Sequence, residues 1–333
     1  MDQLRLLEIL SDGRFHSGDE LGSALGVSRA AVWKAIRNLQ ALELDIHSVK
    51  GKGHRLAAPL ELLKRDAILA QLGDAAAGIQ SLELLLDVES TNSLMLRRIQ
   101  SRELFLEKGR LCVCLAERQS AGKGRRGRTW VSPFGRNMYL SAARQFSTGA
   151  AGLDGLSLVV AVALVRALRQ CGIDGLMLKW PNDVFWQGRK LAGILLEMTG
   201  DVTGECQVVI GVGLNICSPP AVMKEVGQPW IDLQSITPVP PGRNRVVAQV
   251  LRHLATALRE FDGKGFAGFH AEWETLDGCR GRPVVVKMAG SAGAAYSGIA
   301  RGVTEQGALR LETTEGVRVF NGGEVSMTPG AAS

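Results

Sequence analysis

The sequence predicts a protein of the α+β class in three parts, and three observations support this division. The first 58 residues contain three short amphipathic helical patterns and a glycine-marked hairpin. Between residues 82 and 216, strand-length apolar runs follow one another through short turns, which predicts a mixed, mainly antiparallel sheet. From about residue 280, short strands alternate with glycine turns, as in a small β-barrel. We expect domains over residues 1–60, 81–278 and 279–330, with a linker over residues 61–80.

The N-terminal part shows the start and stop signals of closely spaced helices. Leucines at positions 4, 6, 7 and 10 fall on a first helix, which ends near Asp12-Gly13. The S-x-x-E pattern of residues 17–20 is a capping box that starts a second helix, and Gly26 ends it. Ser28 caps a third helix over residues 28–42. Helix, glycine turn and helix form the helix-turn-helix arrangement, in which the third helix reads DNA.

The third helix carries an apolar stripe of Val32, Ile36 and Leu39, which leaves a basic face. Two short strands around Lys50–Gly53 predict a wing beside it. Between residues 28 and 55 there are six Lys or Arg and two acids, so phosphates can be met from helix and wing. The candidate DNA-contacting residues are Ser28, Arg29, Trp33, Lys34, Arg37 and Lys52. A helical protein-interaction domain is the alternative, and Trp33 either reads bases or packs against the wing.

The central and C-terminal parts are divided by their apolar patterns. Strands are expected over residues 82–88, 111–118, 137–144, 175–180, 189–198 and 207–216. Helices are expected over residues 92–100 and 154–171, and two more over residues 244–277. The barrel strands are expected over residues 282–288, 296–303, 307–314 and 317–327.

Composition excludes several classes of protein. No stretch approaches the about 20 apolar residues of a membrane helix, and the N-terminus lacks a secretory leader, so we expect a cytoplasmic protein with no membrane partner. The six cysteines form no C-x-x-C pair and the five histidines are scattered, so no protein-bound metal is expected. The net charge of +6 permits an anionic partner.

The glycine–arginine loop (residues 118–130) is the most unusual segment. It ends in GKGRRGRTW, and residues 118–128 hold five cations and no acid. Glycines let backbone N–H groups approach an anion, and arginines bind phosphate or carboxylate through paired hydrogen bonds. It is not a Walker loop, because Glu117 occupies the first glycine position and Gly124 follows the lysine. The chemistry favours anion binding over nucleic-acid contact or a solvated loop.

Four other polar motifs each have an ordinary structural explanation when taken alone. Residues 179–183, KWPND, suit a proline-marked turn, and residues 188–193 suit a hairpin tip. Residues 211–215, GVGLN, end an apolar strand, and Ser90-Thr91-Asn92 suits a helix cap.

Together these motifs resemble the bacterial family of bifunctional biotin–protein ligases and biotin operon repressors. The resemblance covers nearly the whole length through Ser90–Asn92, Gln119–Trp130, residues 179–183, residues 189–197 and residues 211–215. Lipoate–protein ligases share a related catalytic fold. The resemblance implies a class II synthetase-like catalytic domain and an SH3-like C-terminal barrel.

The resemblance also implies a reaction and its partners. Biotin and ATP form biotinyl-5′-AMP, and a lysine of the biotin carboxyl carrier domain of acetyl-CoA carboxylase then accepts the biotin. Mg²⁺ arrives with the nucleotide, the adenylate-bound form is a homodimer, and operator DNA is the second partner. One alternative is a ligand-sensing repressor without ligase turnover, and another is a ligase whose N-terminal domain no longer regulates.

Finally, the resemblance implies roles for residues by position. The catalytic candidates are Lys190, Arg125 and Asp183. The biotin-site candidates are Ser90, Thr91, Asn92, Gln119, Lys123, Gly124, Arg125 and Lys190. The ATP or adenylate candidates are Arg126, Arg128, Trp130, Asn182, Asn215 and Trp230, and Trp130 could also be core. Lys123 stands where the family commonly has arginine, which keeps the charge but loses the bidentate fork.

Overall fold

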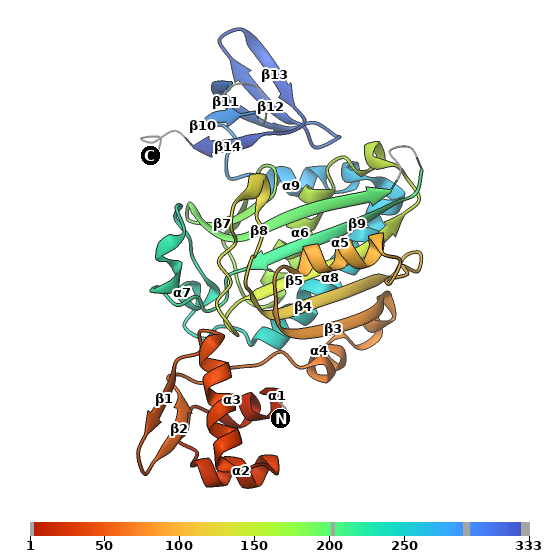
Figure 1. Ribbon diagram of the computed structural model, residues 1–333. Helices are drawn as coiled ribbons and strands as arrows, with labels where there is room; N and C mark the ends of the chain where they lie inside the picture. The colour runs from red at the N-terminus through yellow and green to blue at the C-terminus, as the bar shows by residue number, and fades with distance from the viewer. Residues whose placement is uncertain (1–2, 201–203, 289–293, 328–333) are drawn as a thin grey trace.

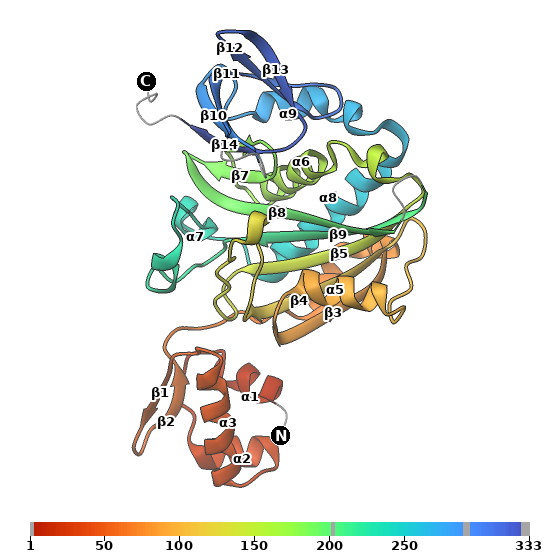
Figure 2. The same cartoon turned by 45° about the horizontal axis from the view of Figure 1, so that its top comes forward.

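The computed structural model describes residues 3–200, 204–288 and 294–327. A small helical unit, a central sheet and a small all-β unit follow one another along the molecule (Figures 1 and 2). The chain starts in the first unit and ends in the last, so the central sheet lies between the two smaller units.

The N-terminal unit is a helix-turn-helix with a wing, as expected. Its helices are α1 (Gln3–Leu10), α2 (Gly18–Leu25) and α3 (Arg29–Ala41), and its wing strands are β1 (Ile46–Val49) and β2 (Gly53–Leu56). Ser17 and Glu20 form the capping box, and the Ser28 hydroxyl accepts from the backbone N–H of Ala31. Gly26 takes the left-handed conformation that ends α2.

The central sheet has the strand order β3-β4-β5-β9-β8-β7-β6. Among the described residues, β3 and β4 pair in parallel and the other neighbours pair antiparallel. The strands are β3 (Ile79–Val88), β4 (Leu111–Gln119), β5 (Met138–Phe146), β6 (Leu176–Lys179), β7 (Asp183–Trp186), β8 (Arg189–Gly200) and β9 (Cys206–Leu214). The mixed, mainly antiparallel sheet is therefore confirmed. Strand β7 was not predicted, because Val184-Phe185-Trp186 is too short between two turns to show a period.

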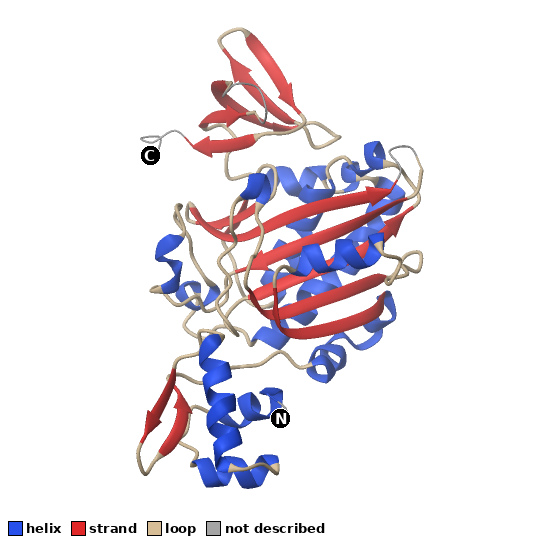
Figure 3. Ribbon diagram, in the orientation of Figure 1, coloured by secondary structure: helices blue, strands red, loops and turns tan. Residues whose placement is uncertain are grey.

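Helices cover both faces of this sheet (Figures 1 and 3). The long helices α6 (Leu156–Gln170) and α8 (Arg243–Lys264) pack together on one face, and α5 (Thr91–Gln100) lies on the other. The shorter helices are α4 (Arg65–Leu72), α7 (Leu233–Ile236) and α9 (His270–Leu276). Short 3₁₀ turns are η1 (Gly73–Gly78), η2 (Arg125–Gly127), η3 (Ala150–Leu153), η4 (Val222–Glu225) and η5 (Phe266–Gly268).

The segment expected to be a linker contributes to the central core. Ile68 and Leu72 of α4 are fully buried, and α4 packs against α8. Earlier in the same segment, the Glu61 carboxylate accepts from the backbone N–H of Arg243 at 2.6 Å. Residues 61–72 are therefore held on the central domain and do not form a free tether. No helix among the described residues is long and apolar enough to cross a membrane.

The C-terminal unit is an antiparallel sheet in the order β13-β12-β11-β10-β14. Its strands are β10 (Pro283–Lys287), β11 (Ala295–Val303), β12 (Leu309–Thr313), β13 (Gly316–Phe320) and β14 (Glu324–Met327). Three of the four expected strands are confirmed, whereas the one expected over residues 317–327 is divided into β13 and β14, which lie at opposite edges of the sheet. Residues 328–330 of the expected domain lie outside the described residues. The indole N–H of Trp180, in the β6–β7 turn, donates to the carbonyl of Gly307 at 3.0 Å, which ties this unit to the central sheet.

Candidate functional site

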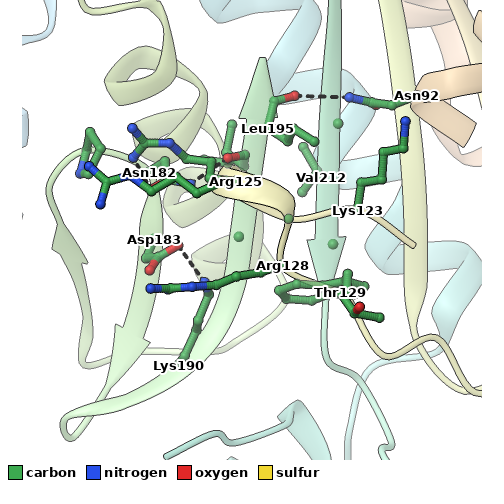
Figure 4. Close-up of a pocket in the computed structure, with 18 of the residues that line it drawn as sticks. Asn92, Lys123, Arg125, Arg128, Thr129, Asn182, Asp183, Lys190, Leu195 and Val212 are labelled. Carbon is green, nitrogen blue, oxygen red and sulfur yellow. Dashed lines mark hydrogen bonds and ion pairs between the residues drawn. The ribbon is translucent and has the colours of Figure 1, made fainter. Parts of the chain in front are cut away.

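One cleft brings together residues from distant parts of the chain (Figure 4). It has an open volume of about 1000 Å³ and is lined by the start of α5, the glycine–arginine loop, β5, the β6–β7 turn, β8, β9, Gln228 and β14. All eight biotin-site candidates line it: Ser90, Thr91, Asn92, Gln119, Lys123, Gly124, Arg125 and Lys190. Asp183 and four of the nucleotide candidates line it as well: Arg126, Arg128, Trp130 and Asn182.

A second, smaller pocket of about 340 Å³ adjoins this cleft and holds the remaining nucleotide candidates, Asn215 and Trp230. The two pockets share Trp130 and Lys190, which therefore stand at the junction. The catalytic, biotin-site and nucleotide candidates are thus all brought into one continuous site.

Lys190 and Asp183 form an ion pair at this junction. The distance from Lys190 Nζ to Asp183 Oδ1 is 2.8 Å, and the two side chains are 14% and 15% exposed (Figure 4). They face each other because Asp183 begins β7 and Lys190 follows the hairpin tip on the neighbouring strand β8. The backbone of Lys190 also bonds to Pro229 and Ile231, so the loop that carries Trp230 lies against β8.

The glycine–arginine loop folds back on itself and bends towards the C-terminal unit. Lys123 and Thr129 form an isolated antiparallel bridge, and Arg126 at the tip has a φ of 57°. Arg125 donates to Asn182 Oδ1 at 3.1 Å and to the carbonyl of Gly323 at 3.3 Å. Burial, together with the charge of Arg126, lowers the pKa of Arg125 from its ordinary value, although the group stays cationic.

Two further arginines of the loop, Arg126 and Arg128, are paired with Glu324 of β14. Arg128 Nη1 lies 2.6 Å from Glu324 Oε1, and Arg126 Nη1 lies 3.4 Å from Glu324 Oε2. Burial alone would raise the pKa of Glu324. The hydrogen bond from Arg128 and the charges of both arginines outweigh this effect, so the pKa lies below its ordinary value and the carboxylate stays ionised. The same cations that could bind phosphate are therefore held by an acid of the protein itself.

The Trp130 ring explains why Gly193 and Gly213 have no side chain. A Cβ added at Gly213 would lie 2.4 Å from the Trp130 ring, and one added at Gly193 would lie 3.0 Å from it. The ring thus lies against Gly193 of β8 and Gly213 of β9, and Lys190 Nζ is 5.7 Å from its centroid. The sequence left open whether Trp130 is core or lines the site, and the structure places it in the wall of both pockets.

A different part of the cleft is lined by the start of α5. The Ser90 hydroxyl caps the helix, and the backbone N–H of Thr91 donates to Gln119 Oε1 at 2.9 Å. The Asn92 amide points down onto the sheet, where its Nδ2 donates to the carbonyl of Leu195 (Figure 4).

Sequence reasoning missed three polar residues at the cleft. Ser141 and Glu197 contact the residues of the α5 start, and Glu324 holds the arginines. A serine inside the apolar strand NMYLSAAR was a signal for the first, because buried hydroxyls need partners. Nothing in the sequence around Glu324 indicates its pairing with the arginines, since these residues are almost 200 positions apart in the chain.

The reading helix presents its predicted residues outward. Ser28, Arg29, Trp33, Lys34, Arg37 and the wing residue Lys52 are all exposed. Trp33 is 56% exposed, with the Arg37 guanidinium 4.9 Å from its ring, so much of the ring faces solvent. One face of the N-terminal unit therefore offers cations and an aromatic ring.

Comparison with known proteins agrees with this arrangement. A family model for the biotin/lipoate A/B protein ligase family matches residues 87–215, an HTH domain model matches residues 2–55, and a model for the biotin protein ligase C terminal domain matches residues 281–328. The bifunctional ligase/repressor BirA of Escherichia coli is 41% identical over 324 residues, which is 97% of this chain and 96% of the relative. The BirA of Bacillus subtilis is 28% identical over 97% of each chain.

A solved structure supports the same assignment. The biotin protein ligase of Aquifex aeolicus in complex with biotin and ATP has a TM-score of 0.61 and 27% identity, and the match covers 75% of this chain and 99% of that one. With a relative this similar along almost its whole length and a family match for each of its three units, the chain belongs to the family of bifunctional biotin–protein ligases and biotin operon repressors.

Proposed function

We propose that this chain is an ATP-dependent biotin–protein ligase that also acts as a biotin-responsive transcriptional repressor. The observation that carries the ligase activity is the pair of adjoining pockets that meet at Lys190 and Trp130. A two-part ligand such as biotinyl-5′-AMP has its acyl–phosphate linkage between an acid part and a nucleotide part. Lys190 stands where that linkage would lie.

The first step is adenylation. A carboxylate oxygen of biotin attacks the α-phosphorus of ATP, a P–O bond forms, and the bond to the β-phosphate breaks as pyrophosphate leaves. Such a step needs mainly positioning and charge stabilisation. We assign charge stabilisation to Lys190 and Arg125, and phosphate binding to Arg126 and Arg128. The last two must exchange Glu324 for phosphate oxygens as the nucleotide enters.

The second step is transfer. The amine of the acceptor lysine attacks the carbonyl carbon of the mixed anhydride, the C–O bond to phosphate breaks, and AMP leaves. The attacking amine must lose a proton, and Asp183 is the carboxylate nearest to Lys190 in the cleft. We assign to Asp183 the orientation of the incoming lysine. Closure of the glycine–arginine loop over the adenylate would keep water from the anhydride.

The remaining candidate residues are assigned by their positions in the family motifs. Five residues are assigned to biotin: Ser90, Thr91, Gln119, Lys123 and Gly124. Asn182, Asn215, Trp130 and Trp230 are assigned to the nucleotide. Lys123 supplies charge without the fork of an arginine, so we expect its contact with the ligand to be less directional.

The partners form part of the same proposal. The acceptor is the biotin carboxyl carrier domain of acetyl-CoA carboxylase, and operator DNA meets α3 and the wing of a homodimer that forms when the adenylate is bound. In the described part of the chain no three His, Cys, Asp or Glu side chains are grouped to hold a metal ion. We therefore expect Mg²⁺ to enter with ATP, and we derive no step through it. A cytoplasmic location belongs to the proposal as well.

A sensor without turnover is the competing function, and the same arrangement argues against it. Binding biotin alone does not need an ion pair of Lys190 and Asp183 placed between two pockets.

Transfer of biotin tests the proposal directly. The protein is mixed with ATP, Mg²⁺, biotin and a biotin acceptor domain, with lipoate in a parallel reaction, and the acceptor is weighed by mass spectrometry. We expect a gain of one biotinyl group. A lipoyl gain instead would change the substrate, whereas adenylate that stays on the protein without transfer would favour the sensor.

A further inference from the structure

Asn92 lies over three neighbouring strands of the central sheet. Ser141 of β5 pairs with Gly211 of β9, and Gly211 pairs with Leu195 of β8, so these three residues form one row across the sheet. The Asn92 amide lies directly above the middle of this row. A Cβ added at Gly211 would be 2.5 Å from Asn92 Oδ1, so only glycine leaves room for the amide.

The polar atoms of the Asn92 amide are used by the sheet. Nδ2 donates to the carbonyl of Leu195 at 3.3 Å and to Glu197 Oε2 at 2.8 Å. On the other side, the Ser141 hydroxyl lies 2.5 Å from Oδ1 and donates to it. Only one orientation of the amide satisfies these neighbours. The carbonyl of Leu195 and the carboxylate of Glu197 can only accept, so they must face Nδ2, and the Ser141 hydroxyl can donate to Oδ1. Asn92 is 4% exposed and Ser141 is fully buried, so water does not replace these bonds.

This arrangement continues into the residues that face the ligand. Ser141 Oγ is also 2.7 Å from Thr91 Oγ1, which lies 3.1 Å from Gln119 Oε1. The backbone N–H of Thr91 donates to Gln119 Oε1 at 2.9 Å. Gln119 Nε2 in turn donates to Ser132 Oγ at 3.2 Å. The side chains of Thr91 and Gln119 are therefore oriented by a chain of bonds that begins on the sheet.

We propose that Asn92, Ser141 and Glu197 are positioning residues, which hold the first turn of α5 on the sheet and so orient Ser90, Thr91 and Gln119 towards biotin. We name Ser141, Gly211, Leu195 and Glu197 the amide seat. The inference rests on the proposed biotin site, and it gives Asn92, one of the biotin-site candidates, a positioning role. The two Nδ2 hydrogens have partners within the protein.

The test compares four substitutions by the KM for biotin, the KM for ATP and kcat. Ser141→Ala leaves Asn92 Oδ1 buried without a donor, and we expect the biotin KM to rise on the order of 10-fold. Glu197→Gln keeps an acceptor for Nδ2, so its biotin KM should stay within about threefold of wild type. Ser93→Ala is the matched control, because its hydroxyl is buried on the same helix with no hydrogen-bond partner. The ATP KM and kcat should not change in these three variants.

Asn92→Asp gives a readout that a general loss of packing would not. It places a carboxylate against Glu197 and against the carbonyl of Leu195, where two like charges disfavour ionisation. We expect its biotin KM to rise on the order of 100-fold at pH 7. Part of this loss should be recovered towards about pH 5, because a proton shared by the two carboxylates replaces the lost donor. Wild type should show no such recovery.

Two results would overturn the inference. One is a biotin KM for Ser141→Ala equal to that of Ser93→Ala, and the other is a rise of both KM values with a fall in kcat, which would indicate general loosening. Thermal unfolding of each variant identifies any that fails to fold, and Ser141→Ala and Glu197→Gln then decide the question. Calorimetric titration with biotin alone separates this test from the proposed function. A wild-type protein that binds biotin without transferring it refutes the ligase activity, while the biotin affinities still judge the amide seat.

Discussion

The start of α5 and the tip of the glycine–arginine loop, residues 125–128, line different parts of one cleft, and they are held in different ways. At the α5 end, buried groups of the sheet fix Asn92 and Thr91 through a continuous set of hydrogen bonds. At the loop end, Arg126 and Arg128 bond to Glu324 of another structural unit, and Arg128 is 60% exposed. The first end is built for one arrangement, whereas the second can exchange its partner.

This difference matches what each end would bind. A small uncharged ring system such as the biotin bicycle is recognised best by fixed donors and acceptors, because few contacts must supply the affinity. Phosphates are bound mainly through charge, which tolerates movement of long side chains. Four predictions test this comparison, and they are given from the largest expected effect to the smallest.

Lys190→Ala should have the largest effect. Lys190 lines both pockets, and we have assigned to it the stabilisation of charge on the carboxylate and the α-phosphate. We expect adenylate formation to fall about 100-fold or more, with the fold retained. The release of pyrophosphate measures this step. Arg189→Ala is the control, because that neighbouring cation stacks on Trp186, outside the cleft. Undiminished adenylate synthesis by Lys190→Ala would refute the role.

Arg125→Gly should affect the retention of the adenylate more than its synthesis. Arg125 donates to Asn182 on the central sheet and to Gly323 of the C-terminal unit, so it joins the loop to both walls of the cleft. Without it, we expect the adenylate to leave early, on the order of 10-fold faster, and to label exposed lysines of other proteins. Mass spectrometry of an added protein that lacks an acceptor domain measures this. Labelling confined to the acceptor would contradict the prediction.

Two glycine substitutions should separate the ends of the cleft. Gly211→Ala places a methyl group 2.5 Å from the Asn92 amide, and Gly213→Ala places one 2.4 Å from the Trp130 ring. We expect the first to raise the biotin KM and the second to raise the ATP KM, each on the order of 10-fold. Steady-state kinetics with each substrate varied in turn measures both.

Gly227→Ala is the control for this pair, because no atom lies within 4 Å of the added methyl group. If Gly211→Ala and Gly213→Ala raise the two KM values equally, the ends of the cleft are not independent.

Local patterns and family motifs predicted most of the fold, and long-range contacts explain what they did not predict. The capping box at Ser17 and the hairpin at Lys50 are set by neighbours in the chain, so they are visible in the sequence. The pairing of Arg128 with Glu324 depends on how two units meet, and no local pattern encodes that. The contacts of the Asn92 amide could not be predicted for the same reason, since its partners Leu195 and Glu197 lie more than 100 residues away.

The smallest effect is expected from the pH dependence of the Glu324 ion pairs. The pKa of Glu324 is held below its ordinary value of 4.5, because the bonds and charges of Arg128 and Arg126 outweigh burial. A carboxyl with a lowered pKa stabilises the folded state above that ordinary value, and the contribution is lost as pH falls through the folded-state pKa. Glu324→Gln should therefore lower the free energy of unfolding by at most about 1 kcal/mol between about pH 8 and about pH 5. The difference from wild type should shrink below pH 4.5.

Urea titrations of both proteins across this range measure that difference. Glu305→Gln is the control, because Glu305 is exposed on a turn of the same unit. In the presence of ATP the difference should also shrink, since phosphates then take the place of the Glu324 carboxylate on the arginines. If Glu324→Gln behaves like Glu305→Gln at pH 7, the C-terminal unit does not hold the loop, and both ends of the cleft would have to be organised by the central sheet alone.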